Sequence, residues 1–159
     1  MPEVPLIIAY FLIVTSGRII RINEAAYTQN HIVRGRDIHS ALFNFSKDHD
    51  GLFPCDITGP AASAEDCFNQ LLTGGYIDSE KVFWNKKAAK SRVVSKLSPN
   101  NVGVLTANEN AWGYVKGLST SSRVNLPILF DSFIKPGEFS TSVWLGQGVI
   151  VKINGATNT

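Results

Sequence analysis

The chain has 159 residues, which is the size of one domain and is long enough to bury a hydrophobic core. Hydrophobic residues make up 44% of it and charged residues 18%, a balance that excludes an intrinsically disordered chain. The formal net charge of +2 is too small to indicate nucleic-acid binding, so we expect no nucleic-acid partner.

The most apolar stretch lies near the N-terminus. The run VPLIIAYFLIV occupies 4–14, and no charged residue occurs from Val4 to Gly17. This run is shorter than the roughly 20 apolar residues that a membrane-spanning helix needs. The Met-Pro-Glu before it lacks the positive charge of a secretory signal. Two interpretations therefore stay open beside a signal peptide: the lower part of a longer membrane helix, and a buried helix or strand of the core.

A single long helix is compatible with about 6–48, because no proline occurs between Pro5 and Pro54. We expect the helix to end near Asp50, since Gly51 readily adopts the left-handed conformation just past a helix end. The second half is amphipathic, with one apolar stripe at i, i+3, i+4 and i+7 formed by Ile38, Ala41, Leu42 and Phe45. Residues 1–20 are then the apolar start of this helix, and 21–159 form a soluble domain that includes its amphipathic half.

The remaining elements are shorter. A second helix is predicted over 64–73, because Ser63 and Asp66 have the spacing of a capping box and Gly74 and Gly75 follow the last apolar residue. In the last strand candidate, Val149, Val151 and Ile153 alternate with the residues between them, which indicates a strand with one buried face. The strand candidates are 81–84, 102–105, 111–115, 126–130, 142–145 and 149–153.

Two further features allow more than one interpretation. Cys55 and Cys67 lie twelve residues apart without a CxxC or a Cys/His cluster, so a zinc site is not indicated. They form a disulfide in an oxidising compartment, or else they are two small buried thiols. The segment 85–96 holds five Lys or Arg and no acid, which is typical of a solvated loop and, alternatively, of a phosphate-binding patch.

The stretch KDHDGLFP at 47–54 has some features of a calcium loop. With Asp48 and Asp50 at loop positions 3 and 5, Gly51 falls correctly at position 6. Ser46 then falls at position 1 and Ile57 at position 12, where an EF-hand needs a bidentate Glu. An EF-hand is therefore excluded, and a looser calcium site at Asp48 and Asp50, with help from Asp56, stays as an alternative to two solvated acids at a helix end.

No local motif indicates catalysis. On one helix His31 and His39 would lie two turns apart, which is too far to share a metal ion. The sequence contains no HExxH, GxSxG, GxGxxG or GxxxxGK motif. The Ser-Thr-Ser-Ser run at 119–122 is predicted to be a turn. We therefore expect no enzymatic activity and no cofactor.

Two segments resemble type IV pilin-like proteins, especially the pseudopilins related to the major subunit of type II secretion. In the first, RGRDIHSALFNFSKDHDGLFP at 34–54, the junction after the family's N-terminal helix is matched by Arg36, Ile38, Ala41, Leu42, Phe45, Asp50, Gly51, Phe53 and Pro54. In the second, ENAWGYVKGLSTSSRVNLPILFDSF at 109–133, the later sheet region is matched by Glu109, Asn110, Trp112, Tyr114, Gly117, Leu118, Ser119, Pro127, Leu129 and Asp131. The terminal VIVKINGATNT is similar to the last strand and turn of that group.

The chain departs from the family at its N-terminus. The family begins with a short basic leader, then a Gly, a methylated Phe and a Glu inside the apolar helix. Counted back from 34–54, that Glu falls just before Met1, and Glu3 does not match it. Leader cleavage, N-methylation and Glu-mediated docking are therefore not carried over to this chain.

The resemblance implies a pilin-like α+β fold, with a long N-terminal α-helix packed on a small antiparallel β-sheet and a second short helix. It implies a structural subunit of a type IV pilus-like or type II secretion pseudopilus filament that assembles with copies of itself, other pilin-like subunits and the inner-membrane machinery. The chain would cross the bacterial inner membrane once, with its domain in the periplasm or, after assembly, outside the cell. Helix packing is assigned to Leu6, Ile7, Phe11, Ile13, Ile38, Leu42 and Phe45. Related major pseudopilins bind calcium in a late loop, in roughly the region of Asp131.

Two other classes of function are weighed against a filament subunit. A secreted or membrane-anchored adhesin or binding domain would use exposed aromatic side chains, with Trp84, Trp112, Tyr114 and Trp144 as candidates, although such residues also pack cores and sheets. A small hydrolase would need a His within hydrogen-bond distance of a Ser or Asp.

Overall fold

The computed structural model describes residues 28–55, 63–84, 104–106, 109–131, 133–135, 138–139 and 148–158. The apolar run 4–14 and the basic segment 85–96 lie outside these residues. The chain divides into two compact units, Met1–His31 and Ile32–Thr159, and the second unit contains the sheet and the second helix.

The N-terminal helix is helical over 28–47 in the described residues, and the earlier part of its predicted span lies outside them. All four residues of the predicted apolar stripe are buried, with Ile38 and Leu42 fully enclosed. The opposite face is exposed at Asp37, Ser40 and Asn44. The 3.6-residue period thus places one face in the core and the other in solvent, as predicted. Among the helices of the described part of the chain, none combines the length and the apolar character needed to cross a bilayer.

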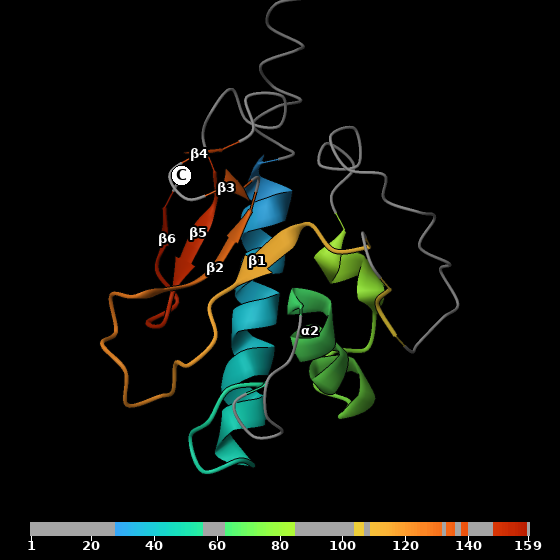
Figure 1. The fold of residues 1–159 in the computed structure, drawn as a ribbon, viewed down its shortest axis with the longest axis vertical. Coiled ribbons are helices and arrows are strands. Elements are labelled where there is room, and N and C mark those ends of the chain that lie inside the picture. Colours follow the sequence, from blue (N-terminus) through green and yellow to red (C-terminus); the bar gives the residue numbers. More distant parts are fainter. Residues whose placement is uncertain are drawn as a thin grey trace, which may run out of the picture. The chain divides into compact units, whose positions relative to one another are not determined.

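A four-stranded antiparallel sheet covers the apolar face of this helix (Figure 1). Its strand order is β1 (Trp112–Tyr114), β2 (Pro127–Asp131), β5 (Ile150–Lys152) and β6 (Thr157–Asn158). Strands β3 (Phe133–Lys135) and β4 (Glu138–Phe139) form a separate antiparallel pair. The α+β fold with an N-terminal helix against a small antiparallel sheet is therefore confirmed.

Strand β5 has the predicted alternation. Val149, Val151 and Ile153 are each at most 2% exposed, whereas Ile150 and Lys152 are only half-buried. Because successive side chains of a strand point to opposite faces, this pattern shows that one face of β5 packs against the core.

The second helix, α2 (Ala64–Thr73), begins and ends where the sequence predicts. The Oγ of Ser63 accepts from the Asp66 amide, and the Asp66 carboxylate accepts from the Ser63 amide, so the capping box is complete. Gly74 is the C-cap residue. Phe68 faces inward and stacks on Phe83 at 4.7 Å, which joins α2 to the core.

The predicted strand at 81–84 is wrong. The residues form a short 3-10 helix, η1 (Glu80–Phe83), which begins at Ser79, whose Oγ accepts from the Lys81 amide. A 3-10 helix has three residues per turn, so Glu80 and Phe83 fall on the same side, and both are buried. The stack of Phe83 on Phe68 therefore favours a turn over an extended strand.

The predicted strand at 102–105 is likewise absent at 104–105, its only described residues. The side-chain amide of Asn69, on α2, takes both main-chain groups of Leu105: Oδ1 accepts from the Leu105 amide at 2.6 Å, and Nδ2 donates to the Leu105 carbonyl at 3.0 Å. A side chain thus takes the place of a neighbouring strand. The candidate strand at 142–145 lies outside the described residues.

The helix and the sheet approach each other closely at Gly35. A Cβ atom added at this position would lie 2.7 Å from Cη2 of Trp112 and 2.9 Å from Cγ2 of Val151. The Trp112 ring, from β1, therefore packs directly on the helix backbone. Glycine lowers helix propensity by about 1 kcal/mol relative to alanine. The close contact with Trp112 explains why a glycine occupies position 35 in spite of this cost.

We predict that Gly35→Ala destabilises the domain although alanine is the better helix former. Forcing a methyl group into a packed contact costs about 1–3 kcal/mol, which offsets the gain of about 1 kcal/mol in helix propensity. Urea unfolding should show a lower midpoint than for the natural chain. Ser40→Ala, on the exposed face of the same helix, is the control and should leave the midpoint nearly unchanged. An increase in the midpoint of Gly35→Ala would show that the ring does not rest on the helix.

Candidate functional site

The candidate site is the end of the N-terminal helix, where the sequence shows both the acidic stretch 47–54 and the first cysteine. The helix ends after residue 47, and the Gly51 amide then donates to the Ser46 carbonyl at 2.8 Å. Gly51 has a φ of 82°, so its predicted left-handed role is confirmed. Asp50 is left-handed as well, at 53°, a conformation that Asp adopts more readily than most residues.

The loop 115–126 holds this helix end from one side. Both the amide and the hydroxyl of Thr120 donate to the Gly51 carbonyl, at 3.0 and 3.3 Å, and Leu52 forms an isolated antiparallel bridge with Ser119. The Ser119 amide donates to Oγ of Ser122 at 2.9 Å, and the run 119–122 forms the turn that was predicted. A Cβ atom at Gly51 would lie 2.6 Å from Oγ1 of Thr120, so glycine is needed here for space as well as for φ.

A tyrosine from the turn after α2 approaches the acidic stretch. The Tyr76 hydroxyl donates to the Asp48 carboxylate at 2.8 Å. His49 stacks on Phe45 with ring centroids 3.9 Å apart and its Nδ1 donates to the Phe45 carbonyl at 2.7 Å. The bond to Asp48 raises the pKa of Tyr76 above the ordinary tyrosine value, and the negative charge of Asp48 adds to the effect.

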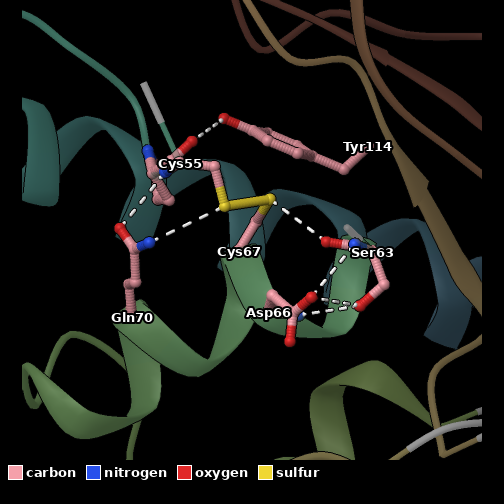
Figure 2. Close-up of a disulfide and its surroundings, with 7 residues drawn as sticks. Cys55, Ser63, Asp66, Cys67, Gln70 and Tyr114 are labelled. Atoms are coloured by element: carbon pink, nitrogen blue, oxygen red, sulfur yellow. Dashed lines mark hydrogen bonds between the residues drawn. A yellow bond between two sulfur atoms is a disulfide. The ribbon is translucent and has the colours of Figure 1, made fainter. Parts of the chain in front are cut away.

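A disulfide between Cys55 and Cys67 fastens the other side of the helix end (Figure 2). Of the two alternatives that the sequence allows, the structure contains the bonded one. Cys55 has a φ of 71°, and its amide donates to Oε1 of Gln70 at 3.2 Å. The Tyr114 hydroxyl donates to the Pro54 carbonyl at 3.1 Å. The bond therefore joins the chain leaving the N-terminal helix to the first turn of α2.

Of the four calcium candidates, Asp56 lies outside the described residues, and the other three are not grouped at one site. Asp48 is bound to Tyr76, Asp50 lies in the left-handed turn, and Asp131 is buried at the end of β2, where its Oδ1 accepts from the Val149 amide. Within the described residues, no three His, Cys, Asp or Glu side chains are grouped closely enough to hold a metal ion. Asp131 thus acts in strand pairing between β2 and β5.

Two of the four aromatic candidates for ligand binding, Trp112 and Tyr114, pack against the core. Trp112 is only 1% exposed and contacts the N-terminal helix, and its indole N–H donates to the Val82 carbonyl at 3.3 Å. Trp84 and Tyr114 are half-buried, and Trp144 lies outside the described residues. Each of the two histidines His39 and His49 donates to a main-chain carbonyl, at Ile153 and Phe45 respectively.

The packing residues assigned to the N-terminal helix fall into two groups. Leu6, Ile7, Phe11 and Ile13 lie outside the described residues. Ile38, Leu42 and Phe45 are buried in the core of the domain itself.

Several residues that shape this region gave no sequence signal. Tyr76, Gln70 and Thr120 make their contacts through tertiary structure, across 15 to 69 positions of the chain. Trp112 belongs to the segment that resembles pilin-like proteins, yet its contact with Gly35 carries no local pattern. A glycine inside an otherwise amphipathic helix is the one local signal that can indicate such a close approach.

Comparison with models of known protein families, with curated proteins and with solved structures finds no match.

We predict that Tyr76 ionises at a higher pH than an ordinary tyrosine. Its raised pKa means that the Tyr76–Asp48 bond contributes stability fully below about pH 10 and loses it as the pH rises through the folded-state pKa. The absorbance of phenolate, taken as the difference between the natural chain and Tyr76→Phe, measures this titration. Asp48→Asn removes the charge and should move the titration back toward the ordinary value. Equal titration curves with and without Asp48 would refute the assignment.

We also predict that the disulfide is a major source of stability. It closes a loop with a sequence separation of 12, for which loop-closure entropy gives about 2–3 kcal/mol. Urea unfolding of the double variant Cys55→Ala/Cys67→Ala should show that loss. The reduced natural chain is the matched control, because it lacks the bond but keeps both sulfur atoms in place. Unchanged unfolding midpoints for both forms would contradict the prediction.

Proposed function

We propose that this chain is a structural subunit of a type IV pilus-like or type II secretion pseudopilus filament, and that it assembles through its N-terminal helix. The observation that carries the proposal is an N-terminal helix whose apolar stripe is buried under a four-stranded antiparallel sheet. Both segments that resemble pilin-like proteins take part in this contact. The segment 34–54 contains the helix stripe, and the segment 109–133 contains β1 and β2.

The division of the helix surface supports this role. The stripe at Ile38, Leu42 and Phe45 is already covered by the chain's own sheet and α2, so it has no surface left for a neighbouring subunit. The apolar run 4–14 is by sequence the surface that a filament core or a membrane would bury. Repeated contacts of this kind, which do not close into a ring, generate helical filaments.

The disulfide supports the proposed location. Disulfides persist mainly in oxidising compartments such as the bacterial periplasm and the cell exterior. A chain held by its apolar segment in the inner membrane, with its domain on the periplasmic side, would form the Cys55–Cys67 bond there. The proposal assigns to the chain no reaction, no cofactor and no nucleic-acid partner; its partners are further copies, other pilin-like subunits and the assembly machinery.

The test is Phe11→Asp, made in the chromosomal copy of the native host. A charge in the middle of an apolar segment opposes its burial in lipid or in a filament core. We expect the natural chain in the membrane fraction and in filaments sheared from the cell surface, and Phe11→Asp in neither. The thermal unfolding of the variant domain should be unchanged.

Asn44→Asp is the matched control, because it adds the same charge on the exposed face of the helix at 28–47. This control should assemble like the natural chain. Filaments that contain Phe11→Asp at the natural level would refute assembly through this segment, and a natural chain absent from both fractions would refute the filament role.

A further inference from the structure

The turn between β5 and β6 holds the only Asn-Gly pair of the sequence, at Asn154 and Gly155. The Gly155 amide donates to the Lys152 carbonyl at 2.9 Å, and the Lys152 amide donates to the Ala156 carbonyl at 2.9 Å. Gly155 has a φ of 77°. This is a three-residue hairpin loop that ends in a left-handed glycine.

The side chain of Asn154 is bent back over the next peptide. Asn154 is exposed, and its Oδ1 accepts from the Ala156 amide at 3.0 Å. That bond closes an Asx turn, in which the side chain of Asn154 folds back along the peptide that joins it to Gly155. The donor also polarises the side-chain carbonyl, and it is positioned to stabilise negative charge that develops on Oδ1. Gly155 has no Cβ atom to hinder attack by its own nitrogen.

We propose that Asn154 is a site of spontaneous deamidation. When the bond from the Gly155 N–H to the Lys152 carbonyl opens, the nitrogen loses its proton to water or base and attacks Cγ of Asn154. A C–N bond forms, and the side-chain nitrogen takes up a proton and leaves as ammonia. Water then opens the cyclic imide at one of its two carbonyls and gives aspartate or isoaspartate. No oxidant or reductant is needed, and the inference does not depend on the proposed filament role.

Asn110 is an internal control that the chain itself supplies. Its Oδ1 accepts from the Trp112 amide at 2.8 Å, which is the same bond to the residue two positions on. Asn110 is only 1% exposed, however, and the following residue is Ala111, whose Cβ crowds the attacking nitrogen. The two sites therefore differ in solvent access and in the next residue, and share the turn geometry.

Isoaspartate at this position would disturb the edge of the sheet. It inserts an extra methylene group into the main chain between Lys152 and Ala156, which are paired in the hairpin. Gly155 rests on the ring of His39, since a Cβ added there would lie 3.2 Å from Cε1. Oγ1 of Thr157 in β6 accepts from the Arg36 guanidinium at 3.2 Å. We expect isoaspartate to release the turn and β6 from these two contacts with the N-terminal helix.

The test is to incubate the folded full chain in mildly alkaline buffer and to map its peptides by mass spectrometry over time. We expect the peptide with Asn154 to gain one mass unit and to split into aspartate and isoaspartate forms, while the peptide with Asn110 stays unchanged. Asn154→Gln should abolish the gain. The fraction that carries isoaspartate should lose hydrogen-exchange protection at β6.

A synthetic peptide that covers 150–158 provides the reference rate. No conversion of Asn154 in the folded chain by the time that this peptide has reacted completely would show that the hairpin blocks attack, and would overturn the proposal. Equal conversion of Asn110 and Asn154 would overturn the argument from turn exposure and the following glycine.

Discussion

The contact between the Trp112 ring and the helix backbone at Gly35 is the constraint on which the rest of the domain depends. With no side chain at Gly35, the ring and Val151 reach the helix itself. This close approach brings β1 and β5 over the stripe of Ile38 and Leu42, so that all of these residues are fully buried. The helix loses intrinsic propensity at this point and gains packed surface, which contributes about 25 cal/mol per Å² of apolar area removed from water.

Hydrogen bonds from polar side chains link the elements around this contact. Arg34 donates through Nη1 to the Trp84 carbonyl at the end of η1, and Arg36 donates to Thr157 in β6. The two arginines are two positions apart on a helix, so they point to different sides and reach different elements. Asn110 binds both the amide and the carbonyl of Trp112, at 2.8 and 2.6 Å. These main-chain groups lie on the edge strand β1, and their pairing with a side chain fixes the strand that carries the ring.

The elements that sequence predicted correctly are those with a local cause. The stripe on the N-terminal helix, the capping box of α2 and the alternation along β5 each follow from a repeat or a spacing. The misses have a tertiary cause. The predicted strand at 81–84 is replaced by the 3-10 helix η1, in which Phe83 stacks on Phe68. Leu105 is hydrogen-bonded to the Asn69 side chain instead of to a strand. In the candidate site, the left-handed Gly51 was predictable, whereas Tyr76 and Thr120 arrive from distant segments and leave no periodic signal.

The region after the helix is held more firmly than a plain connection requires. The loop 115–126 is hydrogen-bonded to Gly51, and the disulfide links Cys55 to α2. Two separate links therefore hold residues that are only four positions apart in the sequence. Together the two links hold the C-terminal end of the helix against the loop 115–126 and against α2. In the filament role that we propose, a helix end held in one place would give every copy the same contact between helix and sheet, which repeated assembly requires.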